Sequence, residues 1–164
     1  MNYDEALKVV EEWVINTGIR KFCTEKCKGH CCPPHYSDRC DRSCLKGERK
    51  ITCSIFLCDL LELRFYEYSK REHSIWAKVN NHIISVLQDA MEEYFSDFDD
   101  LDDFDDEYED EFDDECDFNI YYNDHNKIKK LCEFDDNIIN MLKHIKSCTF
   151  INELDVRGLY RGVL

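Results

Sequence analysis

Apolar residues recur at three- and four-residue steps over much of the chain, and this spacing is typical of one face of a helix. Near the start it predicts a helix over residues 3–17, with an acidic first turn and a stop at Gly18. The apolar face of this helix comprises Ala6, Val9, Val10, Trp13 and Val14.

A second helical region extends from Ser54 to Phe95 and contains no proline. We expect a break near Arg71–Ser74, where the apolar spacing lapses and Ser74 is placed to cap a new helix. The predicted apolar stripes are Leu57, Leu60, Leu61, Phe65 and Tyr68 before the break, and Trp76, Val79, Ile83, Leu87, Met91 and Phe95 after it.

Two more helices are predicted at Lys127–Phe134 and Asp136–Ser147, the latter capped by Asp135 or Asp136. The tail that follows either docks on the core or forms a short strand. The apolar positions of the two predicted helices are Ile128, Leu131 and Cys132 in the first, and Ile138, Ile139, Leu142 and Ile145 in the second. The pattern therefore predicts an all-α helical bundle with an irregular, cysteine-rich, metal-binding segment near the N-terminus.

The length of 164 residues suits a single domain over residues 1–164. We divide it into a helix (3–17), a cysteine-rich segment (22–58, hereafter the cysteine segment), helices (59–96), an acidic stretch (97–117), and C-terminal helices with a tail (125–164).

The net charge of −15 comes from one part of the chain, Glu92–Asp117, called here the acidic segment. It holds 17 acidic residues and no basic one, whereas the rest of the chain carries a net charge of +2. Its apolar residues again follow helical steps: Phe95, Phe98, Leu101, Phe104, Tyr108 and Phe112. Two interpretations remain open: a helix that packs its aromatic stripe on the body or on a protein partner, or a solvated acidic linker.

The first residues have neither a basic nor an apolar leader pattern, and no apolar run has the roughly 18 residues of a membrane span. We therefore expect a soluble, cytoplasmic protein with no membrane partner. Cytoplasmic thiols are kept reduced, which favours metal binding over disulfides.

Eight of the eleven cysteines lie within the cysteine segment, with the spacing C-x3-C-x3-C-C-x7-C-x3-C-x8-C-x4-C. On a helix, the four-residue steps would place the first three on one side. Eight thiolates suit two four-thiolate sites, or one site with spare thiols. The predicted ligands are Cys23, Cys27, Cys31, Cys32, Cys40, Cys44, Cys53 and Cys58.

An iron–sulfur cluster is our first choice for the cofactor, and zinc is the second. Structural zinc sites commonly use C-x2-C pairs, which this chain lacks, and the adjacent Cys31 and Cys32 suit a larger cluster or two sites. His30 and His35 are either substitute ligands or surface residues. Nine Lys and Arg against four acids in Arg20–Lys50 would offset the negative charge of thiolates.

The elements Gly29-His30-Cys31-Cys32 and Cys53-Ser54-Ile55-Phe56-Leu57-Cys58 resemble a family of cysteine-rich proteins that chelate zinc or iron. The resemblance covers about residues 22–59, a region also found in flagellin lysine N-methylases. It implies metal binding through Cys31, Cys32, Cys53 and Cys58.

These features predict a small intracellular metalloprotein that acts as an accessory, binding or redox module. One alternative is an acidic mimic that uses residues 92–117 to occupy a basic partner surface. Another is an iron–sulfur enzyme, although no Gly-rich phosphate loop or acid–base pair supports catalysis. Nucleic acid is an unfavourable partner for so acidic a chain. Outside the cysteine segment, Cys132 is expected to be a buried structural thiol.

Overall fold

A computed structural model describes residues 1–27, 50–96, 125–145, 148 and 151. This part of the chain is all-α, as predicted, and no helix in it is both long and apolar enough to cross a membrane. Its elements are α1 (Tyr3–Asn16), α2 (Ile19–Lys21), the π-helix η1 (Phe22–Cys27), α4 (Ile51–Ile55), α5 (Asp59–Tyr68), α6 (Lys70–Ser96), α8 (His125–Leu131), α9 (Asp136–Asn140) and the 3-10 helix η3 (Met141–His144).

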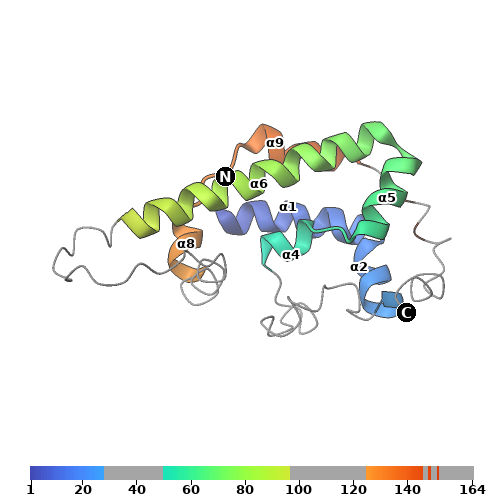
Figure 1. The fold of residues 1–164 in the computed structure, drawn as a ribbon, viewed down its shortest axis with the longest axis horizontal. Helices are drawn as coiled ribbons and strands as arrows, with labels where there is room; N and C mark the ends of the chain where they lie inside the picture. The colour runs from blue at the N-terminus through green and yellow to red at the C-terminus, as the bar shows by residue number, and fades with distance from the viewer. Residues whose placement is uncertain (28–49, 97–124, 146–147, 149–150, 152–164) are drawn as a thin grey trace, which may run out of the picture.

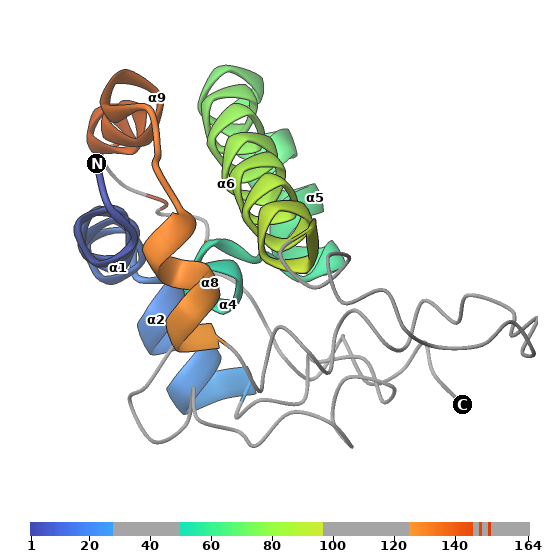
Figure 2. The same cartoon turned by 90° about the vertical axis from the view of Figure 1, so that its left-hand side faces the viewer.

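The two long helices, α1 and α6, run in opposite directions on two sides of the molecule (Figure 1). Viewed nearly along these helices, α9 lies across one side of the pair, and α4 and α8 lie across the other (Figure 2). Helix α4 contacts both α1 and α6, and α9 does the same from the opposite side. The short helices therefore join the long ones around one core.

That core is a single cluster of buried residues drawn from every helical region of the described chain. The predicted face of α1 is confirmed, with Val9 at its partly buried edge. On α6 the first four stripe residues are buried as predicted, and Met91 packs against the core while partly buried, but Phe95 lies at the edge of the stripe. The fully buried residues in this part of α6 are Ala90 and Tyr94. A straight helix repeats every 3.6 residues, so a buried stripe must shift between three- and four-residue steps over 27 residues.

The break between the two middle helices occurs at Ser69, earlier than the predicted Arg71–Ser74. Ser69 is extended, with φ −157° and ψ 102°, and its hydroxyl accepts a hydrogen bond of 3.3 Å from the backbone N–H of Glu72. This is the geometry of a helix N-cap. Ser74, the predicted cap, lies exposed inside α6.

The helices on either side of these two also differ from the prediction at their ends. Helix α4 ends at Ile55, and an extended stretch precedes α5, so the helical region is not continuous from Ser54. The last predicted helix is divided into α9 and η3, with Asp135 as its N-cap, accepting from Asn137 N at 2.8 Å. Leu131 and Tyr68, both predicted to face the core, are exposed.

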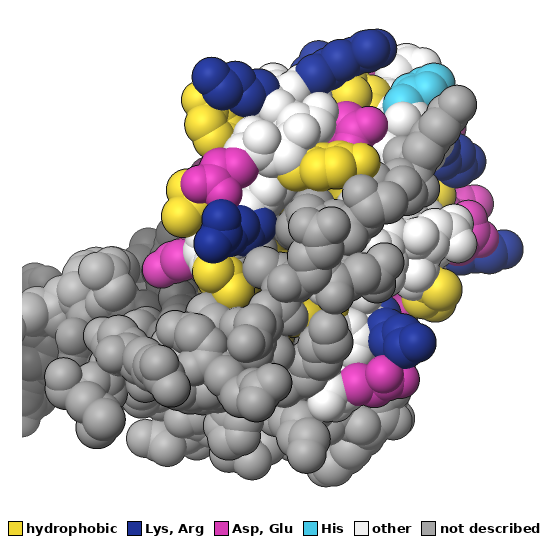
Figure 3. Space-filling view, turned by 90° about the vertical axis from the view of Figure 1, so that its right-hand side faces the viewer, with side chains coloured by type: hydrophobic (Ala, Val, Ile, Leu, Met, Phe, Trp, Pro, Cys, Tyr) yellow, Lys and Arg dark blue, Asp and Glu magenta, His cyan; other side chains and the backbone are white. Residues whose placement is uncertain are grey.

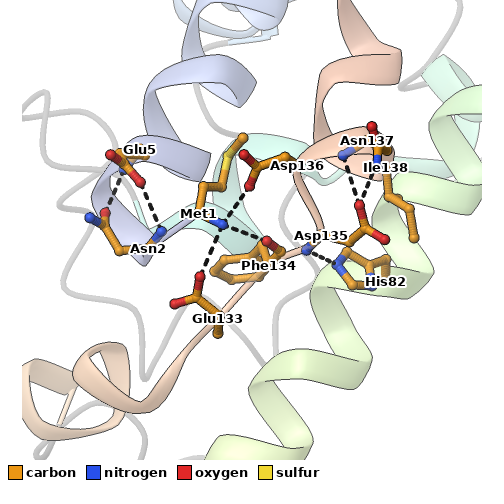
Figure 4. A network of polar contacts seen from close by, with 10 residues as sticks. All are labelled: Met1, Asn2, Glu5, His82, Glu133, Phe134, Asp135, Asp136, Asn137 and Ile138. Carbon is orange, nitrogen blue, oxygen red and sulfur yellow. Dashed lines mark hydrogen bonds and ion pairs between the residues drawn. The ribbon is translucent and has the colours of Figure 1, made fainter.

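The start of α1 is joined to the C-terminal helices by a polar network (Figure 4). The Met1 ammonium donates to a carboxylate oxygen of Asp136 and to the carbonyl of Phe134, both at 2.6 Å, and to Glu133 at 3.2 Å. These contacts raise the pKa of the amino group, chiefly through the hydrogen bond to Asp136. Asn2 and Glu5 form a capping box that begins α1.

Exposed apolar side chains on the described surface include Phe56, Leu63 and Tyr66 near α5. In the view of this end of the molecule, the coloured hydrophobic side chains lie singly between charged and other polar ones (Figure 3). Scattered apolar residues are normal on a protein surface, so their distribution on this face does not indicate a docking site.

Candidate metal centre

Four of the eight predicted ligands lie at the two ends of the cysteine segment, within the described residues. The other four, Cys31, Cys32, Cys40 and Cys44, belong to the middle of the segment, which lies outside the described residues. Cys23 is the second residue of η1, and Cys27 is its last. Cys53 lies in α4, and Cys58 is the N-cap residue of α5. The side chains of Cys23, Cys53 and Cys58 are partly buried thiols, not halves of disulfides.

The predicted helical step from Cys23 to Cys27 falls in a π-helix. A π-helix closes its hydrogen bonds from residue i to residue i+5, one residue further than an α-helix does. The helical turn expected at Cys23–Cys27 is therefore a π-helix, and the shared face of the two thiols stays a prediction, because the Cys27 side chain lies outside the described residues. Across the described ranges, no three Cys, His, Asp or Glu side chains gather closely enough to hold a metal ion.

Helix α4, which carries Cys53, is held at both of its ends by side chains from the long helices. The backbone N–H of Ile51 donates to the Tyr3 hydroxyl at 2.9 Å. At the other end, the indole N–H of Trp76 donates to the carbonyl of Ile55, also at 2.9 Å. A five-residue helix is too short to be stable alone, so these bonds and the burial of Ile51 and Ile55 determine its position.

Glu11 of α1 joins α2, which directly precedes the cysteine segment, to α4 near the other end of that segment. One carboxylate oxygen of Glu11 forms an ion pair with the guanidinium of Arg20, in α2. The other accepts a hydrogen bond from the hydroxyl of Ser54, in α4. Ser54 is only 1% exposed, and a buried hydroxyl requires such a partner. We call these three residues the Glu11 clamp.

Neighbouring contacts fix the same region to the core. Phe22, next to Cys23, is 2% exposed, and the side chains of Cys23 and Cys58 pack against the core cluster. The hydroxyl of Thr24 donates to the carbonyl of Arg20 at 3.0 Å. The positions of Cys23 and Cys58 are therefore fixed by their packing against the core.

The two described cysteines outside the cysteine segment are in different surroundings. Cys132 and Cys148 are 2% and 3% exposed, which confirms the prediction for Cys132. Burial raises the pKa of the Cys132 thiol to about 11 and that of Cys148 to about 12, with Glu72 adding to the effect on Cys148. Because a thiolate is the nucleophile and the metal ligand, these two are structural thiols.

Sequence reasoning missed the Glu11 clamp and the two bonds that hold α4. Glu11 belongs to an ordinary acidic pair on α1, and its sequence neighbours do not distinguish it from the exposed Glu12. The partners of Glu11 are nine and 43 residues away. No local pattern marks such contacts.

Comparisons of the chain with protein-family models, with curated proteins and with solved structures found no match. The resemblance of residues 22–59 to the zinc- or iron-chelating family stays a prediction.

Proposed function

We propose that this protein is a small cytoplasmic metalloprotein that binds an iron–sulfur cluster, or alternatively zinc, through the cysteine segment. It would act as an accessory, binding or redox module. The observation that carries this proposal is the Glu11 clamp, which joins α2, just before the cysteine segment, to α4 inside it, together with the partly buried thiols of Cys23, Cys53 and Cys58.

The physical argument concerns the entropy of closing a loop. Residues 28–49 connect η1 to α4, and a free chain of that length would lose conformational entropy when its ends met. Here the fold has already brought the ends to fixed positions. This fixed placement of the two ends supports a site that uses ligands from both of them.

The test is metal analysis of protein purified without oxygen. An iron–sulfur cluster predicts a brown protein with broad visible absorbance and bound iron and sulfide, and zinc predicts a colourless protein with stoichiometric zinc. Cys53→Ser should lose most of the metal, whereas the matched variant Cys132→Ala should keep it. Folded wild-type protein that contains neither metal would refute the proposal.

A second candidate function is binding of a basic protein through the acidic segment. Its first residues belong to α6, where Glu92 and Glu93 are exposed and Tyr94 is buried. The described start of the segment therefore has acids facing outward and an aromatic residue facing inward. The last turn of α6 contains no basic residue to offset this charge.

This candidate predicts salt-sensitive capture of basic proteins. Full-length protein should retain them at low ionic strength and release them at about 0.5 M salt, where charges are screened within a few ångströms. Deletion of residues 97–117 should abolish the capture. Equal capture by the deletion variant would exclude the acidic segment as the binding surface.

A further inference from the structure

The connection between α8 and α9, residues 132–135, is held from two sides (Figure 4). On the side of α1, the backbone N–H of Phe134 donates to the carbonyl of Met1 at 2.8 Å. On the side of α6, the backbone N–H of Asp135 donates to Nε2 of His82 at 3.0 Å. Two adjacent amides therefore bind opposite sides of the fold, and only the second binds a group that can take up a proton.

The bond from Asp135 fixes the protonation state of the His82 ring. A ring nitrogen that accepts a hydrogen bond carries no proton, so the ring is neutral with its proton on Nδ1. An imidazolium carries a proton on both nitrogens and cannot accept from a backbone N–H. The ring also packs edge-on against the buried Phe134, with ring centroids 6.1 Å apart. Protonation of His82 therefore removes the acceptor that ties the connection to α6.

The acids of the connection are already engaged with other partners. The carboxylate of Asp135 caps α9 and accepts from its first backbone N–H groups at 2.8 Å and 3.4 Å. The carboxylates of Glu133 and Asp136 pair with the Met1 ammonium at 3.2 Å and 2.6 Å. A protonated His82 would have to take a carboxylate from one of these partners. The packed elements also carry Lys78 and Asp89 on α6, Lys129 and Lys130 in the last turn of α8, and Lys143 and His144 in the last turn of η3.

We propose that His82 is a pH-sensitive latch, which holds the α8–α9 connection to α6 while its ring is neutral and releases it when the ring is protonated. Imidazole is the side chain that changes charge between about pH 5 and 8, so the latch is closed above this range and open below it. The Met1 ammonium stays charged as the pH falls, so the connection keeps its contacts on the side of α1. Acidification therefore loosens the C-terminal helices from α6 but not from α1, whether or not the protein binds metal.

The experiment is amide hydrogen exchange of the full-length protein by NMR, between about pH 7.5 and pH 5.5, above the range in which carboxylates take up protons. Protection is expressed relative to an unstructured peptide at each pH, and the ring nitrogen shifts of His82 report its tautomer and its titration. Protection of the Asp135 amide should fall about fivefold or more as His82 titrates, as the loss of one hydrogen bond implies. The adjacent Phe134 amide is the internal control, because its acceptor, the Met1 carbonyl, does not titrate.

Two variants separate the ring's charge from its shape. His82→Gln keeps an acceptor oxygen about as far along the side chain as Nε2 but does not titrate, so protection of the Asp135 amide should stay high at every pH. His82→Phe has no acceptor, so the same protection should be low at every pH. His125 is present in all three proteins, and its protonation would weaken the Phe134 and Asp135 amides alike.

Three results would overturn the latch. The first is a His82 ring with its proton on Nε2 at about pH 7.5, since that nitrogen could not accept from Asp135. The second is protection of the Asp135 amide that does not follow the titration of His82. The third is a fall of equal size at Phe134, or in His82→Gln, because either would report a loosening that does not depend on this bond.

Discussion

The indole N–H of Trp76, in α6, donates a hydrogen bond of 2.9 Å to the carbonyl of Ile55, at the end of α4. This bond joins the longest helix to the short element that carries Cys53. Both residues are buried, so the carbonyl has no solvent to replace the indole. The position of α4 depends on this contact, which leads to the first prediction.

Trp76→Phe should lower the free energy of unfolding by about 2–4 kcal/mol, because it leaves a buried carbonyl without its donor and removes part of a packed ring. Urea unfolding measures the change. Trp13→Phe is the matched control, since Trp13 is also buried and its Nε1 has no acceptor among the described residues. It loses ring volume but no hydrogen bond, and equal losses in the two variants would contradict the role of the Trp76 bond.

Glu11→Gln should weaken the Glu11 clamp while preserving the shape of the side chain. The partners are partly buried, so we expect a loss of about 1–2 kcal/mol in unfolding free energy, more than an exposed ion pair contributes. Metal release to a chelator should also become faster, because α2 and α4 are then less firmly joined. The exposed neighbour Glu12→Gln should change neither quantity, and matching effects at both positions would contradict the role of the clamp.

His125 should make the protein less stable as the pH falls. Its ring packs edge-on against Tyr3 with centroids 5.2 Å apart, and burial, with Lys50 and Lys129 nearby, lowers its pKa to about 4. The unfolded chain takes up this proton near pH 6.5 and the folded protein only near pH 4. Stability from this group is therefore present above about pH 6.5 and is lost between there and pH 4.

The loss is about 3 kcal/mol for the full shift and roughly 1–2 kcal/mol after allowance for solvent screening of a partly exposed ring. The measurement is the unfolding free energy of wild type and of His125→Phe, each at about pH 7 and at about pH 4.5. The other ionisable groups are the same in the two proteins, so a smaller fall in His125→Phe reports His125 itself. Substitution of the exposed His144 by Gln provides the control. An unchanged pH dependence in His125→Phe would exclude this assignment.

Thiol reactivity should divide the described cysteines into two groups. At pH 8 the thiolate fraction of Cys132 is on the order of one part in a thousand, and that of Cys148 is lower, given their raised pKa values. After metal removal by a chelator, alkylation followed by mass spectrometry should label Cys23, Cys53 and Cys58 first. Early labelling of Cys132 or Cys148 in folded protein would contradict their burial.

Helix type and approximate position were predictable because each long helix must bury one face, and the residues of that face recur in the sequence. The stripe from Trp76 to Leu87 and the face of α1 illustrate this. The ends of the helices were less predictable. Ser69 and Ser74 are equally plausible caps in sequence, and only the position of α5 against α6 determines which one is used.

For the candidate site, the sequence identified the cysteines but not what holds them. The thiols at 23, 53 and 58 were expected to be ligands, and the structure places them in elements anchored to the core. The anchors are Tyr3, Glu11 and Trp76, none of which stands near a cysteine in the chain.

Local composition and periodicity thus determined by themselves that the described chain is helical, which faces are apolar, and where charge and sulfur are concentrated. Such properties depend on residues within a few helical turns of each other, so they can be read from a single sequence. Only the tertiary structure decided that Glu11 joins Arg20 to Ser54, and that Trp76 fixes the end of α4. These contacts join residues up to 43 positions apart, and they form only when the burial of several helices has brought their backbones together.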